Sequence, residues 1–202
     1  MRFEGHKHSI TCFQIFFDDP AETEQRNFLT IDTYTDSRDY LVTGSSDWTA
    51  KLWAIKSGTF LKTFSGHNGG ILSLALDISQ RVLFTASADQ TIKKWDVVSG
   101  EYRQTLKGHN ASVTKIAVKD KLLVSTSADW SVRMWSAQFG DFIKKFEGGH
   151  EHMVNCLKWM DGCVITGSSD ANICVFDPRV LHAKTTMISH KVKWRVKLTL
   201  KY

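Results

Sequence analysis

Four segments of the chain repeat one pattern at a nearly constant interval. Each copy has a Gly-His pair, an apolar strand, a Ser/Thr-rich strand that ends in aspartate, and a strand that ends in an aromatic residue. The aspartates are 42, 40 and 41 residues apart, and an aromatic residue follows each by six positions: Asp47, Asp89, Asp129 and Asp170, with Trp53, Trp95, Trp135 and Phe176. Repeats of about this length form units that pack chiefly against their neighbours. The sequence therefore predicts a repeat architecture.

The residues that carry the repeat closely resemble those of the WD-repeat family of β-propeller proteins. They read SSDWTAKLWA, SADQTIKKWD, SADWSVRMWS and SSDANICVFD, and the resemblance covers roughly residues 3–180. It implies an all-β fold of antiparallel four-stranded blades. We expect a partial propeller over residues 1–187, with blades at about 9–65, 70–107, 112–147 and 153–187.

Four blades suggest an open arc, because closed propellers have about 4 to 8 blades and this family is dominated by seven. The opening RFEGH matches the ends of outer strands elsewhere in the chain, such as KTFSGH and QTLKGH. We interpret the chain as an excerpt of a seven-bladed ring. The explanations for such an excerpt are a partial chain, a truncated isoform and an incomplete gene model. A homo-oligomer that closes the ring is the alternative.

Each turn aspartate is expected to bind an upstream histidine, because a turn carboxylate accepts both backbone and imidazole N–H groups. The resemblance adds a Ser/Thr four residues before the aspartate and the aromatic residue six after it. The four expected groups are His6, Thr43, Asp47 and Trp53; His67, Thr85, Asp89 and Trp95; His109, Ser125, Asp129 and Trp135; and His150, Thr166, Asp170 and Phe176. Phe176 has no indole N–H, so we expect a slightly weaker fourth blade.

The recurrence of histidine and aspartate in every copy favours a structural role over a catalytic dyad or metal ligands. The pairs His6/His8 and His150/His152 superficially resemble zinc ligands, but one histidine of each pair is already assigned to an aspartate. We therefore predict no catalytic residue, no metal and no cofactor. The cysteines, with no CxxC pair, are expected to be small buried residues, with a Cys163–Cys174 disulfide as the minority alternative.

Three residues are candidates for binding partners. Trp48 and Trp130 directly follow turn aspartates, where the other copies have Gln90 and Ala171. An aromatic side chain held on an exposed turn suits a binding hot spot, and packing over the neighbouring blade is the alternative interpretation. Arg179 ends the segment Phe-Asp-Pro-Arg, which is similar to the WDxR ending by which some family members dock a ubiquitin-ligase adaptor.

Two segments depart from the repeat. Residues 17–38 are a polar, acidic loop insertion, which we expect to be solvated or to dock a partner. Residues 188–202 form a divergent tail, within which residues 191–202 hold five basic residues and no acidic one. The net charge of +5 therefore lies in this tail, and the rest of the chain is electrically balanced. Nucleic acid is not expected to bind the blades.

The predicted function is a non-catalytic scaffold that presents loops to peptides or domains of other proteins. The first alternative is a substrate receptor of a cullin-type ubiquitin ligase. An alternative of another class is a tail that binds nucleic acid or anionic lipid. With no signal-like or membrane-spanning segment, we expect an intracellular, mainly cytoplasmic location, with a nuclear one as the alternative.

Overall fold

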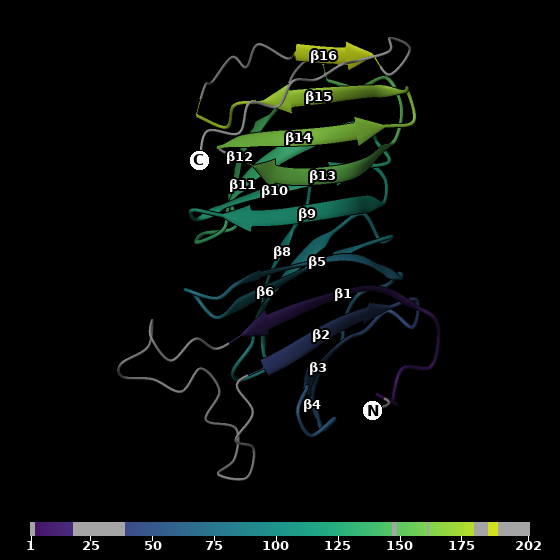
Figure 1. Ribbon diagram of the computed structural model, residues 1–202, viewed down its shortest axis with the longest axis vertical. Coiled ribbons are helices and arrows are strands. Elements are labelled where there is room, and N and C mark those ends of the chain that lie inside the picture. Colours follow the sequence, from purple (N-terminus) through teal and green to yellow (C-terminus); the bar gives the residue numbers. More distant parts are fainter. Residues whose placement is uncertain (1–2, 18–38, 147–148, 161, 180–185, 190–202) are drawn as a thin grey trace.

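The computed structural model of the chain describes residues 3–17, 39–146, 149–160, 162–179 and 186–189 (Figure 1). Sixteen strands form four antiparallel sheets of four strands each, and no helix occurs among these residues. The predicted all-β architecture of four-stranded blades is therefore confirmed. No described helix is long and apolar enough to cross a membrane.

Each blade consists of four consecutive strands, and each strand pairs with the next. Blade 1 contains β1 (Ile10–Phe17), β2 (Asp39–Ser45), β3 (Ala50–Ala54) and β4 (Phe60–Phe64). Blade 2 contains β5 (Ile71–Asp77), β6 (Val82–Ser87), β7 (Ile92–Asp96) and β8 (Tyr102–Leu106). Blade 3 contains β9 (Val113–Lys119), β10 (Leu122–Ser127), β11 (Val132–Ser136) and β12 (Phe142–Lys145). Blade 4 contains β13 (Val154–Met160), β14 (Cys163–Ser168), β15 (Asn172–Phe176) and β16 (Thr186–Ser189).

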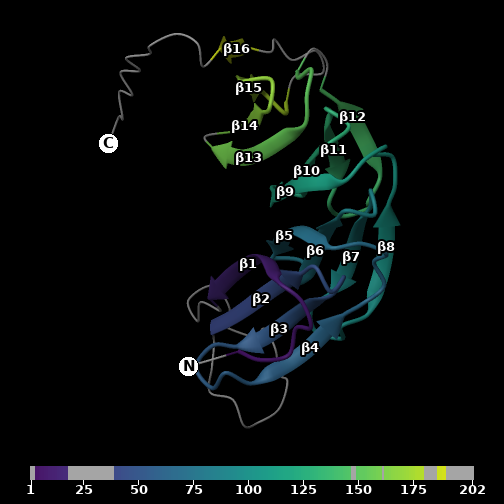
Figure 2. The ribbon, with the colours of Figure 1, turned by 90° about the vertical axis from the view of Figure 1, so that its right-hand side faces the viewer.

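The blades follow one another along an arc (Figure 2). The first strand of each blade, β1, β5, β9 or β13, lies on the concave side, and the outer strands β4, β8 and β12 lie on the convex side. Adjacent first strands contact one another along the inside of the arc. The turns that follow the second strands of all blades consequently share one rim.

The hydrophobic core lies between the blades. Three clusters of buried residues join blade 1 to blade 2, blade 2 to blade 3, and blade 3 to blade 4. The residues that open β5, β9 and β13 are fully buried in these clusters: Ile71, Val113 and Val154. Gly44 of blade 1 makes room for Ile71, because a Cβ atom on Gly44 would lie 2.6 Å from its Cγ2 atom. Each blade thus accepts an apolar residue of the next.

The N-terminal segment packs as the end of an outer strand does. The Phe3 ring lies 5.8 Å from the Trp53 ring, much as Phe64 at the end of β4 lies 5.9 Å from Trp95. This similarity follows the sequence match between RFEGH and KTFSGH.

The two divergent segments lie mostly outside the described residues. The expected insertion separates β1, which ends at Phe17, from β2, which begins at Asp39, and residues 18–38 are not described. At the other end, β16 pairs with β15 and runs to Ser189, two residues beyond the limit of 187 expected for the fourth blade. Residues 190–202 of the basic tail lie outside the description.

The expectation that all four cysteines are buried is wrong. All four thiols are free, and Cys174 is buried, whereas Cys12 and Cys163 are half-buried and Cys156 is exposed. Cys156 lies on the side of blade 4 that faces away from blade 3, and the minority disulfide between Cys163 and Cys174 is not formed. Burial raises the pKa of the Cys174 thiol to about 11, and the nearby Asp170 carboxylate adds to this effect.

Candidate functional site

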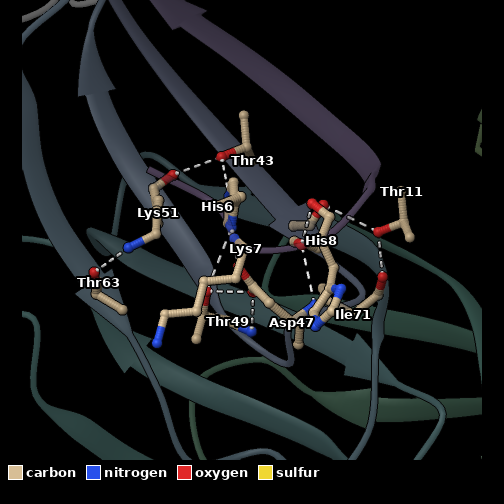
Figure 3. A network of polar contacts seen from close by, with 12 residues as sticks. His6, Lys7, His8, Thr11, Thr43, Asp47, Thr49, Lys51, Thr63 and Ile71 are labelled. Atoms are coloured by element: carbon tan, nitrogen blue, oxygen red, sulfur yellow. Dashed lines mark hydrogen bonds and ion pairs between the residues drawn. The ribbon is translucent and has the colours of Figure 1, made fainter. Parts of the chain in front are cut away.

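The structure brings the four expected residues of blade 1 into one hydrogen-bonded group, and Figure 3 labels three of them, His6, Thr43 and Asp47. His6 Nδ1 lies 2.8 Å from the Asp47 carboxylate, and His6 Nε2 lies 2.8 Å from the Thr43 hydroxyl. The indole N–H of Trp53 donates to the same hydroxyl at 2.9 Å. Because a carboxylate only accepts, Nδ1 carries the proton, and Nε2 then accepts the hydroxyl proton of Thr43. The group connects the segment before β1, the turn after β2 and the end of β3.

Blades 2 and 3 contain the same group with nearly the same distances. In blade 2, the His67–Asp89, His67–Thr85 and Trp95–Thr85 contacts measure 2.6, 2.7 and 2.9 Å. In blade 3, the His109–Asp129, His109–Ser125 and Trp135–Ser125 contacts measure 2.9, 2.8 and 2.8 Å. The imidazole side chains of His67 and His109 are buried, so a ligand has no access to them.

Blade 4 contains the group without its indole donor. His150 contacts Asp170 at 3.0 Å and Thr166 at 2.8 Å, while the Phe176 ring packs 4.8 Å from Phe146. Cys174 stands where the other blades have Lys51, Lys93 and Arg133, and its thiol contacts the Gly149 carbonyl oxygen at 3.0 Å. This blade therefore keeps the histidine and aspartate contacts but loses one polar link to its third strand.

The turn aspartates are held as carboxylates. Burial alone would raise the pKa of Asp89, but hydrogen bonds from His67, Thr91 and the Asn68 amide outweigh it and hold the pKa well below its usual range. The pKa values of Asp47, Asp129 and Asp170 are lowered in the same way, by bonds that exceed the effect of burial. An aspartate that is fully hydrogen-bonded and ionised stabilises a turn and has little capacity left for a ligand.

The turns after β2, β6, β10 and β14 place one residue each in the left-handed region of backbone conformation. The residue that follows the aspartate has a φ of 70° at Trp48, 72° at Gln90, 68° at Trp130 and 66° at Ala171. Trp48 is 52% exposed and Trp130 is 54% exposed. Both indoles are therefore about half accessible on the rim of the arc.

Trp130 also packs against the next blade. Its ring lies 5.8 Å from the ring of His152, which is exposed and belongs to the loop that leads into β13. Trp130 therefore packs on the neighbouring blade, as one interpretation expects, and also keeps about half of its surface exposed, as the binding interpretation expects. Sequence reasoning did not identify His152 as a neighbour of Trp130, because the two residues belong to different repeats.

Arg179 lies on a different surface, in the turn that follows β15. It is exposed, and its Nε and Nη2 atoms donate to the two oxygens of Asp177 at 3.0 and 2.9 Å. The side-chain and backbone hydrogen bonds from Arg179 lower the pKa of Asp177 to about 2. The guanidinium is therefore held in a fixed position while most of its surface remains accessible.

Within the part of the chain that the structure describes, no three histidine, cysteine, aspartate or glutamate side chains are grouped as metal ligands. His6 and His150 point to their aspartates and hydroxyl groups. The two HxH pairs therefore do not form a recognisable metal site among these residues.

Known proteins are similar to this chain over most of its length. It is 28% identical over 170 residues to the nuclear distribution protein PAC1 of Tuber melanosporum, covering 70% of this chain and 28% of that protein. It is 32% identical over 154 residues to a guanine nucleotide-binding protein subunit beta of Solanum tuberosum, covering 73% of this chain and 30% of the relative. The chain thus spans less than a third of the length of either relative.

The fold is also similar to that of solved propellers. The computationally designed protein Ika8 matches with a TM-score of 0.73 and 26% identity, over 94% of this chain and 52% of the designed one. The model of the WD domain, G-beta repeat, matches residues 26–54, 58–96, 100–136 and 140–177, more than half of the chain together. Each of the last three matches begins with the outer strand of one blade and continues through the first three strands of the next. Proteins built from this repeat generally act as scaffolds for protein interactions. The chain belongs to the WD-repeat family.

Proposed function

We propose that this chain is a non-catalytic scaffold whose main binding surface is the rim that carries Trp48 and Trp130. The observation that supports the proposal most directly is the exposure of both indoles, 52% and 54%, on turns anchored by a buried hydrogen-bonded group. A rigid aromatic side chain loses little conformational entropy on binding and offers a large contact area. Partners are peptides or domains that can cover these indoles.

The surroundings of the indoles define the kind of partner. Exposed residues at the start of the neighbouring loops are Lys7, Asn68, Asn110 and Glu151, whose backbone amides donate to the turn aspartates. These side chains add one positive charge, one negative charge and two neutral amides to the rim. A partner that presents apolar side chains flanked by uncharged polar groups fits this surface better than a strongly charged one.

The proposal is tested by replacing both tryptophans with glutamine, the residue that blade 2 already has at the same turn position. Gln90 shows that glutamine adopts the required φ, so Trp48→Gln and Trp130→Gln remove the indoles without changing the backbone demand. We expect the tagged double variant to capture fewer partner proteins than the tagged wild-type chain does. Mass spectrometry quantifies the captured proteins.

The matched control is Phe139→Gln, which removes an aromatic residue that is 64% exposed in the turn between β11 and β12. That turn lies at the opposite end of β11 from the Trp130 turn. Equal capture by the wild type and the double variant, or an equal loss in the control, contradicts the proposed surface.

A second candidate function is docking of a ubiquitin-ligase adaptor through Arg179. Its support is the exposed guanidinium held by Asp177. Arg179→Ala is expected to abolish co-precipitation of the adaptor while the partners of the tryptophan rim remain bound. Wild-type precipitates without an adaptor contradict this function. For either function we propose an intracellular, mainly cytoplasmic location.

A further inference from the structure

The first strand of an inner blade places a row of apolar side chains against the preceding blade. In β5 this row is Ile71, Leu74 and Leu76, which are 0, 9 and 7% exposed. They pair with Ser87, Thr85 and Leu83 of β6. The row contributes to the buried cluster between blades 1 and 2.

Blade 1 has an equivalent row that nothing among the described residues covers. Ile10, Phe13 and Ile15 pair with Ser45, Thr43 and Leu41 in the same register, and they are 53, 67 and 46% exposed. We call these three residues the β1 row. Its counterparts in the chain are buried because another blade receives them, so the β1 row is a surface shaped for the side of a blade.

At the other end of the arc, a matching receiving surface has none of the described residues packed on it. A hollow of about 460 Å³ occurs on blade 4, with mostly apolar walls that include Cys156, Leu157, Ile165, Gly167 and Ile173. We call it the blade 4 hollow. Gly167 pairs with Cys156 as Gly44 pairs with Cys12 in blade 1, where Ile71 fills the equivalent space. Among the residues that the structure describes, a Cβ atom on Gly167 would meet Cys156 alone, at 3.4 Å.

The blade 4 hollow also has a hydrogen-bond donor at the required place. In blade 1 the Thr11 hydroxyl donates to the Ile71 carbonyl oxygen, and in blade 3 the Thr114 hydroxyl donates to the Val154 carbonyl oxygen. Asn155 occupies the equivalent position in blade 4 and directs one amide N–H to the Ser169 hydroxyl at 2.8 Å. A side-chain amide has two N–H groups. The other one can therefore serve an incoming carbonyl.

We infer that the blade 4 hollow binds the β1 row of a second copy of this chain. Ile10 enters beside Gly167, in the way that Ile71 packs beside Gly44. Two copies joined by two such contacts have eight blades, which lies within the range of closed propellers. Each copy superposes on 52% of the Ika8 chain, so two arcs supply the length of one such propeller.

A second copy is favoured over an unrelated protein because this one chain carries both halves of the contact. Three internal interfaces already show how the two halves fit together. A contact between different surfaces forms open chains of subunits unless the rotation between copies closes the assembly. Two arcs that each span half of a ring satisfy that condition and leave neither surface exposed.

Sedimentation equilibrium of the 202-residue chain tests the inference. The expected mass is twice the chain mass of 22.9 kDa. Ile10→Asp places a charge on the β1 row, and Gly167→Val fills the blade 4 hollow, so each variant is expected to sediment as a single chain. Both changes lie on open surfaces, so the circular dichroism spectrum should stay the same. Ile78→Asp, at a residue that is 46% exposed between β5 and β6, is the control that keeps the double mass.

A cross-link identifies the contact itself. Ile71 and Cys12 line the same space in blade 1, so a cysteine at position 10 should meet Cys156 of the second copy. Mild oxidation of Ile10→Cys is expected to give a covalent pair of chains on a non-reducing gel, and an added Cys156→Ser change should abolish it. A single-chain mass at all concentrations, an open series of larger masses, or a cross-link that does not need Cys156 overturns the inference.

Discussion

The ammonium group of Lys94 in blade 2 donates a hydrogen bond to the carbonyl oxygen of Gln138 in blade 3, at 2.7 Å. The same ammonium also donates to the Ala137 carbonyl oxygen at 2.9 Å, and the side chain is buried. Burial lowers the pKa of Lys94, and the nearby Arg103 charge lowers it further. A buried cation thus links β7 to the turn after β11, across the interface between two blades.

Replacement of this lysine should weaken the interface between blades 2 and 3. Lys94→Met keeps an apolar stem, as Met134 does at the same position of blade 3, but leaves two carbonyl oxygens without their donor. We expect a loss of about 1–2 kcal/mol in the free energy of unfolding, measured by chemical denaturation. Lys62→Met is the comparison, because Lys62 makes only a 3.5 Å contact with the Ser99 carbonyl oxygen and should change stability less. Equal effects of both variants would show that the double contact of Lys94 is not important.

Removal of a turn carboxylate should destabilise its blade. Asp89→Ala leaves His67, the Asn68 and Thr91 amides and the Thr91 hydroxyl without their acceptor. We expect a loss of roughly 1–3 kcal/mol in the free energy of unfolding. Asp141→Ala, at an exposed aspartate, is the control. An unchanged denaturation midpoint for Asp89→Ala would exclude a stabilising role for this hydrogen-bonded group.

Stability should fall in acid because the four turn aspartates have lowered pKa values. Below the unfolded-state pKa of about 4, the unfolded chain binds more protons than the folded chain does. The contribution of these aspartates is therefore complete above that pH and is lost as the pH falls toward the folded-state values. Denaturation midpoints between neutral pH and about pH 3 measure the slope. Asp89→Asn should make the slope shallower, and an identical slope would contradict the assignment.

The fourth blade should gain stability from an indole. Phe176→Trp restores a donor for the Thr166 hydroxyl, although Phe146 lies closer to Phe176 than Phe64 lies to Trp95. We expect a net gain of about 0.5 kcal/mol, after some repacking. Trp53→Phe should cause a loss of about 1 kcal/mol or more in blade 1, because Thr43 loses its donor. If Phe176→Trp lowers the midpoint of unfolding, the pocket around residue 176 is too small for an indole.

The repeat made the fold predictable, because it fixes which residues end strands and which form turns. Once the turn aspartates are aligned, the second and third strands of all four blades lie at nearly the same spacing from them. The insertion displaces β1 from this spacing, and β16 begins three residues later than β4, β8 and β12 do. The spacing of histidine, Ser/Thr and aspartate also predicted these groups, in which the imidazole nitrogens lie 2.6–3.0 Å from the carboxylate and hydroxyl oxygens. Local spacing is sufficient here because all members of one group belong to one repeat.

Contacts between blades were not predictable by the same reasoning. Lys94 and Gln138 belong to different repeats, and the only sequence signal is that Leu52 and Met134 stand at the lysine position in the adjacent blades. The exposure of Cys156 depends on whether a blade covers its side of β13, which the alternation of a strand does not reveal. The pairing of Trp130 with His152 likewise depends on the relative position of two blades.

In each blade, the turn after the second strand requires a positive φ angle at one residue but does not require a particular side chain there. Tryptophan, glutamine and alanine all occupy this position with φ angles between 66° and 72°. Glycine, asparagine and aspartate adopt this conformation most readily and β-branched residues least readily, so the tryptophan, glutamine and alanine found here accept a conformational penalty. Positions 48, 90, 130 and 171 therefore carry different side chains on the same backbone turn, so the residue that each blade presents at the rim can differ without a change in the sheets beneath it.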